Sequence, residues 1–314
     1  MDLGGTSIRS VVAMAGDGVP SIVSRDQRPT PRDGADAIVD AVIASAREAM
    51  RRANVSAGDV VAAGCSSPGP LDHVRGIVLE TPNLVGFRDI TLGDRLTAGI
   101  GTPVFIDRDT CMAAIAEGLV GAAKGTSDFV YVTVSTGVGG GVVSGGRMLR
   151  GVTNTAGEIG HLPVAFQLDP ARGADEDVAR CGCGSYGCVE AYAAGSRMAA
   201  AYGVSDAAAV YEAARRGDAR ATAIVLRAER ALANLAVGLV NVMNPAIIVV
   251  GGSVAEHQPA HVLEPMRRAI AERAFKAPAR AVRVVPAALG PDVGMLGAVL
   301  EARERAAGRG DWFL

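Results

Sequence analysis

The sequence predicts an α/β protein of two lobes that repeat one architecture, with a cleft between them. Three observations lead to this prediction. The chain has 314 residues, which at about 150 residues per domain corresponds to two domains. Its residues are 49% apolar, enough to fill a large core. A hairpin sheet followed by βα units opens the chain, and this order restarts near residue 129.

The first half opens on a turn signal, Gly4-Gly5-Thr6, which leaves a strand of only two or three residues before it. Strand patterns follow at 7–15 and 21–24, and apolar residues then recur at helical spacing along 35–53. The remaining elements of this half are, in order, a strand at 60–65, a Pro-Gly turn at 67–70, a strand at 102–106 and a helix at 110–123.

The second half begins with a sheet of strands at 129–134, 138–144 and 147–150. Gly145-Gly146 is typical of the two-residue turn between the last two strands. A Cys-containing insertion comes next. The later elements are, in order, helices near 196–202, 206–216 and 219–242, a buried strand at 246–250, a helix at 264–275 with Pro265 in its first turn, a strand at 281–285 and a helix at 293–307.

The composition excludes several classes of protein. The chain carries 31 Lys and Arg against 33 Asp and Glu, a net charge of −2, so neither nucleic acid nor an anionic membrane is an expected partner. Its lysines, Lys124 and Lys276, lie outside any G-x-x-x-x-G-K-[ST] loop or V-A-I-K strand, which excludes a Walker P-loop and a protein kinase. No apolar run reaches the ~18 residues of a membrane span, and no signal peptide opens the chain, so we expect a cytoplasmic protein.

Two glycine turns stand at equivalent places in the two halves. Asp2-Leu3-Gly4-Gly5-Thr6-Ser7 offers backbone that can approach an anion, two hydroxyl donors and a carboxylate that can hold Mg²⁺ through water. Ser135-Thr136-Gly137 is the matching turn of the second half. Either turn alone is equally typical of an ordinary hairpin, but the pair suggests two lobes that grip one polyphosphate. A third candidate is the buried strand that ends in Gly251-Gly252, where backbone can meet a flat ring or simply turn.

Three cysteines within eight residues, Cys181, Cys183 and Cys188, are the strongest motif. Glycines among them allow the chain to fold around an ion, and His161 is the best fourth ligand for a tetrahedral zinc. Such a closed site predicts structural zinc that stiffens the loop. The competing interpretation is a flexible loop with reduced or disulfide-paired cysteines.

Asp107-Arg108-Asp109 follows a predicted strand and opens a predicted helix. A carboxylate at this place suits a general base acting on a hydroxyl, although Asp107 or Asp109 can equally cap the helix. Glu158 and Glu190 flank the cysteine motif, so a metal there can orient both as acceptors for ligand hydroxyls.

Together these motifs resemble the ROK family (repressors, open reading frames and sugar kinases) of the actin/hexokinase-like ATPase superfamily, over essentially the whole chain. Residues 2–6 resemble its phosphate-1 loop, 135–141 its phosphate-2 loop and 249–253 its adenosine motif. Residues 67–72 and 81–84 resemble its sugar-side loops, and 157–161 with 181–190 its signature and zinc motif. The resemblance implies a duplicated actin/ribonuclease-H-like fold. Its lobes would be 1–109 plus 298–314, carrying the phosphate-1 and sugar-side loops, and 110–297.

The resemblance also implies a role for each matching position. Asp109 would be the base that takes a proton from a sugar hydroxyl. The substrate-binding residues would be Asn83, Arg108, Glu158, His161, Glu190 and Gly69. The nucleotide-binding residues would be Asp2, Gly4, Gly5, Thr6, Ser7, Thr136, Gly137, Gly251 and Gly252. The metal-binding residues would be His161, Cys181, Cys183 and Cys188 for zinc, with Asp2 for Mg²⁺ through water.

The chain departs from the family pattern in several places. Arg108 replaces an asparagine that binds sugar hydroxyls, Cys111 replaces a second asparagine, and Ser7 replaces a lysine. The few residues that usually precede the phosphate-1 aspartate are also missing. An arginine cannot accept a hydrogen bond from a hydroxyl. Arg108 can point away, bind an anionic substrate group, or lower the pKa of Asp109 and weaken it as a base.

The resulting expectation is an ATP-dependent hexose kinase, most simply one that phosphorylates glucose at O6. The alternatives are a kinase for fructose, mannose, allose or an N-acetylhexosamine, or a sugar-responsive transcriptional regulator or non-catalytic sugar binder. Expected cofactors are ATP, Mg²⁺ and structural Zn²⁺. The expected partners are a small-molecule sugar and further copies of the chain in a dimer or tetramer.

Overall fold

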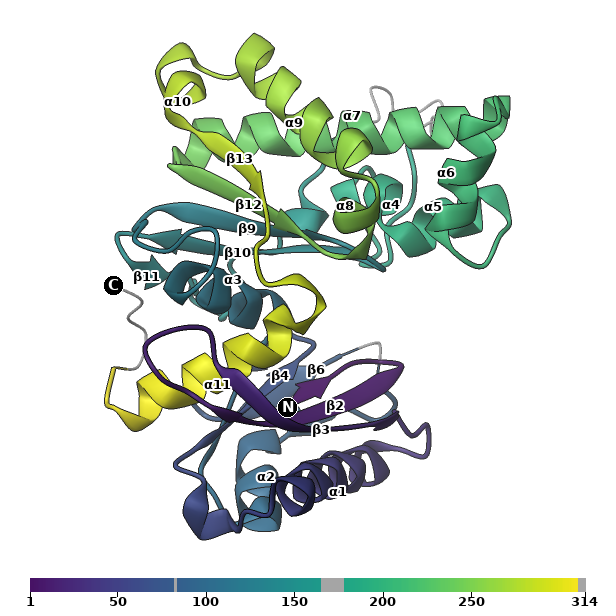
Figure 1. The fold of residues 1–314 in the computed structure, drawn as a ribbon. Helices are drawn as coiled ribbons and strands as arrows, with labels where there is room; N and C mark the ends of the chain where they lie inside the picture. The colour runs from purple at the N-terminus through teal and green to yellow at the C-terminus, as the bar shows by residue number, and fades with distance from the viewer. Residues whose placement is uncertain (82–83, 165–177, 310–314) are drawn as a thin grey trace. The chain divides into compact units, whose positions relative to one another are not determined.

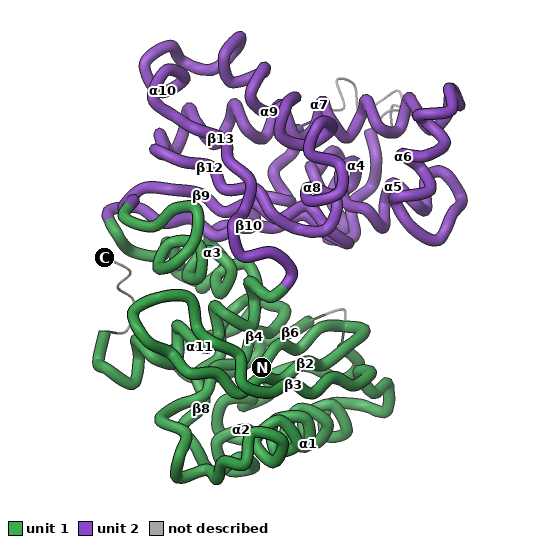
Figure 2. Tube along the Cα trace, in the orientation of Figure 1, with its two compact units in different colours: residues 1–125, 146–156, 292–314 green, residues 126–145, 157–291 purple. Residues whose placement is uncertain are grey.

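The computed structural model describes residues 1–81, 84–164 and 178–309 (Figure 1). The chain forms two compact units (Figure 2). The first contains Met1–Gly125, Gly146–Ala156 and Asp292–Leu314, and the second contains Thr126–Gly145 and Gly157–Pro291. Each unit is therefore built from separate stretches of chain.

The sheet of the first unit has the strand order β3–β2–β1–β4–β8. Its strands are β1 (Asp2–Leu3), β2 (Ser7–Met14), β3 (Ser21–Pro29), β4 (Ala63–Ser67) and β8 (Val104–Arg108). The first three are antiparallel neighbours, whereas β4 is parallel to both β1 and β8. A small antiparallel sheet follows in the sequence, made of β5 (Leu71–Asp72), β6 (Ile77–Glu80) and β7 (Arg88–Ile90).

Helices cover both faces of this sheet (Figure 1). The helices α1 (Ala35–Ala53) and α2 (Leu92–Ile100) lie on one face, where their apolar sides complete a core with β1, β4 and β8. The helices α3 (Asp109–Leu119) and α11 (Val293–Ala306) pack against each other and, through α11, against β4. The α3–α11 approach is close, since a Cβ atom at Gly297 would overlap the Met112 carbonyl oxygen.

The second unit repeats the strand pattern, with β10–β9–β12–β13 in order. The strands are β9 (Phe129–Val134), β10 (Val138–Ser144), β12 (Ile247–Gly251) and β13 (Arg283–Pro286). The hairpin β9–β10 is antiparallel and β12 is parallel to β9 and β13, as in the first unit. Its helices are α4 (Val189–Ala193), α5 (Gly195–Tyr202), α6 (Ala207–Arg215), α7 (Ala219–Met243), α8 (Ser253–His257), α9 (Pro259–Arg273) and α10 (Lys276–Ala281). The repeat confirms the predicted duplicated α/β fold.

Several predicted elements have the observed bounds, and others need correction. The helix at 35–53 and the strands at 129–134 and 138–144 are confirmed. The helix predicted at 264–275 begins earlier, because Pro259 supplies the first turn, where a missing N–H costs nothing, and Pro265 lies inside the helix. The predicted strands at 60–65 and 102–106 lie two or three residues later as β4 and β8, since their mutual pairing sets their register.

The units also differ from the predicted lobes. The segment 110–125, which contains most of α3, groups with the first unit rather than the second, because α3 packs on α11. The segment Gly146–Ala156, with β11 (Arg147–Met148), and residues 292–297 belong to the first unit as well. Among the residues that the structure describes, no helix is both long and apolar enough to cross a membrane.

Glu301 of α11 is a buried acid, 1% exposed, that is paired with Arg305 at 2.6 Å. Burial, followed by the charge of Asp107, raises the pKa of Glu301 from 4.5 to about 7. A folded-state pKa above the unfolded value means that the protonated carboxyl stabilises the fold at low pH. That contribution is complete below 4.5 and is lost as the pH rises through 7.

We therefore compare the free energy of unfolding of Glu301→Gln with that of the parent protein. As the pH rises from 5 to 8, we expect the difference to shift in favour of the variant by at most about 3 kcal/mol. Urea unfolding at several pH values measures the difference. Glu272→Gln, on the exposed side of α9, is the matched control and is expected to show no such trend. Parallel stability curves for the parent protein and Glu301→Gln would contradict the assignment.

Candidate active site

The turn between β1 and β2 is the predicted phosphate-1 loop. The Gly4 amide donates to the Ser7 carbonyl oxygen at 3.0 Å, which closes the turn. Thr30 braces it, since its hydroxyl donates to the Gly4 carbonyl oxygen at 2.7 Å and its amide donates to the Thr6 carbonyl oxygen at 3.0 Å. Gly5 and Thr6 at the tip are exposed. The loop thus has a defined shape with an open tip, as a phosphate cradle requires.

Asp2 precedes this loop and stands opposite Arg9 of β2. The Arg9 guanidinium donates to Asp2 Oδ2 from Nε at 3.1 Å and from Nη2 at 2.5 Å. The other oxygen, Oδ1, faces Gly294 at the start of α11, where a Cβ atom would lie 3.6 Å away. Arg9 was not among the residues predicted from the sequence. The antiparallel register across the Gly-Gly-Thr turn, which places residue 9 opposite residue 2, is the signal that would have found it.

The predicted base, Asp109, lies where β8 passes into α3. Its side chain is exposed in the first turn of α3, and its Oδ1 accepts a hydrogen bond from the Thr110 amide at 2.7 Å. Arg108 occupies the N-cap position of α3, so neither Asp107 nor Asp109 is the N-cap residue that one interpretation of the motif predicted. Exposure leaves the Asp109 carboxylate accessible to a substrate hydroxyl.

Arg108 points back into the first unit. It is 2% exposed, and its Nη2 donates to the Ala156 carbonyl oxygen and, at 3.3 Å, to Cys111 Sγ. Its stem packs against Gly69, where an added Cβ atom would lie 2.9 Å from Arg108 Cδ. Of the three alternatives for Arg108, these contacts within the first unit favour a side chain that points away. Its contact with a substrate stays a prediction.

The predicted phosphate-2 loop, between β9 and β10, has a similar construction. The Ser135 amide donates to the Gly137 carbonyl oxygen at 2.9 Å. The start of α5 braces the turn, because the Gly195 amide donates to the Ser135 carbonyl oxygen at 2.7 Å and Ser196 Oγ donates to the Thr136 carbonyl oxygen at 2.6 Å. Thr136 at the tip is exposed. This second loop is also a rigid turn with an open tip.

The end of β12 lies beside this loop, since Ser253 Oγ is 3.0 Å from Ser135 Oγ. Gly252 has φ of 93°, and an added Cβ atom would lie 2.6 Å from both Thr133 Oγ1 and the Val134 carbonyl oxygen. Packing on β9 therefore explains the glycine without any ligand. The contact of residues 251 and 252 with adenosine stays a prediction.

Glu190, in the first turn of α4, connects the phosphate-2 loop to the cysteine motif. The Val138 amide donates to Glu190 Oε2 at 3.3 Å, and Cys181 Sγ lies 3.8 Å from Glu190 Oε1. Glu158 is exposed, immediately before the short helix η2 (Ile159–His161). The two predicted hydroxyl acceptors thus both adjoin residues of the cysteine–histidine cluster.

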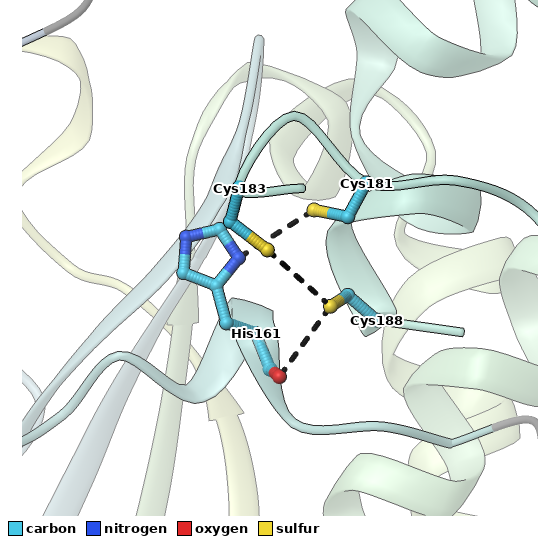
Figure 3. Close-up of side chains that lie close together, drawn as sticks. All are labelled: His161, Cys181, Cys183 and Cys188. Carbon is cyan, nitrogen blue, oxygen red and sulfur yellow. Dashed lines mark hydrogen bonds between the residues drawn. The ribbon is translucent and has the colours of Figure 1, made fainter. Parts of the chain in front are cut away.

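His161 and the three cysteines converge as predicted (Figure 3). One ligand atom from each of the four residues lies within 4.8 Å of the others. Cys181 Sγ is 3.6 Å from His161 Nδ1, and Cys183 Sγ is 3.8 Å from Cys188 Sγ. Bonds of 2.3 Å to sulfur and about 2.05 Å to nitrogen give tetrahedral edges of about 3.8 Å and 3.6 Å. The observed spacings therefore fit a zinc-sized cation.

The thiols of this cluster differ in acidity. Burial raises the pKa of Cys181 and raises that of Cys188 to about 12, whereas a hydrogen bond from the Ser185 amide lowers the pKa of Cys183. Binding of a cation would therefore release protons from the buried thiols. The remaining cysteines, Cys65 and Cys111, are buried, and burial raises the pKa of each to about 12.

The predicted residues thus gather within each unit. In the first unit, the phosphate-1 loop, Gly69, Arg108 and Asp109 lie on turns that leave the ends of β1, β4 and β8. In the second unit, the phosphate-2 loop, Glu190, the cysteine–histidine cluster and the end of β12 form one connected set. Asn83 lies outside the described residues.

The chain resembles known proteins over nearly its whole length. The family model described as the ROK family matches residues 1–305. A glucokinase of Halalkalibacterium halodurans is 31% identical over 95% of this chain and 92% of its own length. An N-acetylmannosamine kinase of Escherichia coli is 34% identical over 96% of this chain and 97% of its own length.

A solved structure also resembles the chain over nearly its whole length. A ROK family glucokinase from Streptomyces griseus, crystallised in complex with glucose and AMPPNP, superposes with a TM-score of 0.75 and 29% identity. The match covers 96% of this chain and 98% of that one. The similarity extends over both units, so it includes every predicted motif.

Proposed function

Because the chain belongs to the ROK family, we propose that it transfers the γ-phosphoryl group of ATP to a hexose hydroxyl, most simply O6 of glucose, with Asp109 as general base. The chain is a sugar kinase, as its curated relatives and the glucose- and AMPPNP-bound structure support. The main support for the role of Asp109 is that its carboxylate is exposed where β8 ends. The tips of the two glycine loops are exposed as well.

The proposed mechanism assigns a task to each part of the site. Asp109 accepts the proton of the attacking hydroxyl as the hydroxyl oxygen bonds to the γ-phosphorus and the bond between that phosphorus and ADP breaks. Backbone N–H groups and the hydroxyls of Thr6 and Thr136 bind phosphate oxygens, where they offset the developing charge. Asp2 would hold Mg²⁺ through water, and that ion would neutralise phosphate charge. Glu158, Glu190 and His161 orient the sugar through its other hydroxyls.

We further propose that His161, Cys181, Cys183 and Cys188 hold a structural zinc ion. The spacing of their ligand atoms supports this assignment. Four protein ligands leave no open coordination position, so the ion would supply rigidity rather than reaction chemistry. The rigid loop would then orient Glu190, which lies beside Cys181, and Glu158, which lies three residues before His161.

The choice of sugar is open to direct test, because relatives of similar identity act on different sugars: one is a glucokinase and the other an N-acetylmannosamine kinase. A coupled assay of ADP release over glucose, fructose, mannose, allose and N-acetylated hexosamines measures the preference. We expect the highest kcat/KM with glucose. A higher value with N-acetylmannosamine would reassign the substrate. Sugar binding by calorimetry without ADP release would favour the regulator or sugar binder.

Cytoplasmic location and homo-oligomerisation stay predictions.

A further inference from the structure

The segment that enters the first unit at Gly146 and leaves it at Ala156 ends in a closed loop. The Ala156 amide donates to the Arg150 carbonyl oxygen at 3.0 Å, which joins the two ends of residues 150–156. Gly151 and Asn154 take left-handed φ values of 70° and 58° inside it. We call this segment the 150–156 loop. Arg150 and Ala156 together form its base.

From one side of this base, Arg150 binds the turn that precedes the predicted catalytic residue. Its Nη1 lies 2.8 Å from Asp107 Oδ1 and 2.6 Å from Asp107 Oδ2. The Asp107 side chain is 1% exposed and that of Arg150 is 12% exposed, so water screens the pair little. Asp107 Oδ1 also accepts a hydrogen bond from the Arg108 amide at 2.7 Å. The ion pair therefore acts directly on the backbone of the β8–α3 turn.

A second arginine makes the return contact. The Arg108 guanidinium donates to the carbonyl oxygen of Ala156, at the other end of the loop base. Arg150 thus reaches from the loop to the turn, and Arg108 reaches from the turn to the loop. We call these two contacts, Arg150 with Asp107 and Arg108 with Ala156, the arginine clasp. Two contacts in opposite directions resist rotation of the turn more than either contact alone.

The groups around the clasp maintain its charges. Burial lowers the pKa of Arg150, but the charge of Asp107 and the hydrogen bond to it outweigh this effect and raise the pKa above its ordinary value. On the α11 side, Glu301 pairs with Arg305 at 2.6 Å. On the α3 side, Cys111 Sγ accepts a hydrogen bond from Arg108, and burial keeps its thiol protonated. Arg150 therefore stays charged, and Asp107 is the carboxylate bonded to it.

We propose that Arg150 is a positioning residue for phosphoryl transfer, because the arginine clasp fixes the β8–α3 turn on which Asp109 stands. The inference rests on the proposed role of Asp109 as base. Asp109 is exposed, whereas Asp107 and Arg108 immediately before it are buried and bonded to the 150–156 loop. The buried backbone of Asp107 and Arg108, which these contacts fix, therefore determines the direction of the Asp109 carboxylate.

The test compares Arg150→Met with Arg147→Met, an exposed arginine on the same segment. We expect kcat for hexose phosphorylation to fall about 10- to 100-fold in Arg150→Met, with the KM for ATP nearly unchanged, because a displacement of about 1 Å at the base costs up to about 10²-fold in rate. Amide hydrogen exchange of residues 107–110 and 150–156 is expected to speed up in Arg150→Met. Arg147→Met is expected to resemble the parent protein in both measurements.

Two further variants separate positioning from stability. Asp107→Asn combined with Arg150→Met removes both buried charges, so it is expected to recover thermal stability without recovering kcat. Arg150→Lys keeps the charge but loses the planar fork, and we expect an intermediate kcat. These variants also serve if Arg150→Met does not fold. A kcat within twofold of the parent protein in Arg150→Met, or one that recovers together with stability in the double variant, would overturn the proposal.

Arg108→Met tests the return contact and is expected to speed up exchange in the same two segments. A rise confined to the hexose KM, with exchange unchanged, would overturn that contact and assign Arg108 to the sugar. If the parent protein phosphorylates no sugar, the proposed function fails separately. Hydrogen exchange would then still test whether the arginine clasp holds the β8–α3 turn. Unchanged exchange in Arg150→Met would refute the clasp.

Discussion

Asp109→Asn is expected to lower kcat for hexose phosphorylation by about 10²- to 10⁴-fold, the range that a positioned general base contributes. The amide has the shape of the carboxylate but cannot take the proton of the hydroxyl. Hexose binding should persist, because the contacts of Asp107 and Arg108 that hold the turn are unchanged in this variant. Coupled ADP release measures the rate, and calorimetry measures sugar binding.

Asp94→Asn is the matched control for this variant. Asp94 and Asp109 are both exposed acids in the first turn of a helix in the first unit, α2 and α3 respectively. Each substitution removes the same favourable interaction with the helix dipole, worth about 0.3–1 kcal/mol. A loss of rate seen only in Asp109→Asn therefore reports chemistry. Turnover near the parent value in Asp109→Asn would remove Asp109 as the base.

The second large effect is expected at the cysteine–histidine cluster. The purified protein should contain about one zinc ion per chain, the stoichiometry of a closed four-ligand site. Cys183→Ser should lose most of this zinc and lower Tm by more than about 5 °C, because the metal contributes directly to the stability of the folded loop. Cys183 is the exposed cysteine of the cluster, so its loss opens no cavity in the core. Elemental analysis and thermal unfolding are the measurements.

Ser185→Ala, in the same loop and equally exposed, is the control and should keep both its zinc and its Tm. Activity should fall in Cys183→Ser as well, since Glu190 adjoins Cys181 and the proposed zinc site would orient it. A preparation that is folded and active without metal would refute the zinc assignment. Full zinc content in Cys183→Ser would show that Cys183 is not a ligand.

Local patterns predict most of the second unit. The strands at 129–134 and 138–144 have their predicted bounds, and left-handed φ values at Gly145 and Gly146 confirm the two-residue turn. Such features depend on residues that are neighbours in the chain. The small sheet β5–β6–β7 of the first unit escaped prediction, because strands of two to four residues are too short to show a period. The helix α2 of the same unit was also not predicted.

The unit boundaries also escaped prediction, for a different reason. The segment Gly146–Ala156 follows directly on a hairpin of the second unit, and its sequence gives no sign that it belongs to the first. Its placement depends on the arginine clasp and thus on residues about 43 positions away in the chain. Periodicity and turn chemistry carry no information about such contacts.

By itself, the sequence determined the order of most elements, the two glycine turns and the four residues of the cysteine–histidine cluster, because spacing along the chain specifies each of them. Only the tertiary structure decided that Arg9 pairs with Asp2, that Arg108 binds the Ala156 carbonyl oxygen and that Arg150 reaches Asp107. Arginine side chains are long and rotate freely, so their direction is set by strand register and by the packing of distant segments. No local pattern of residues encodes that choice.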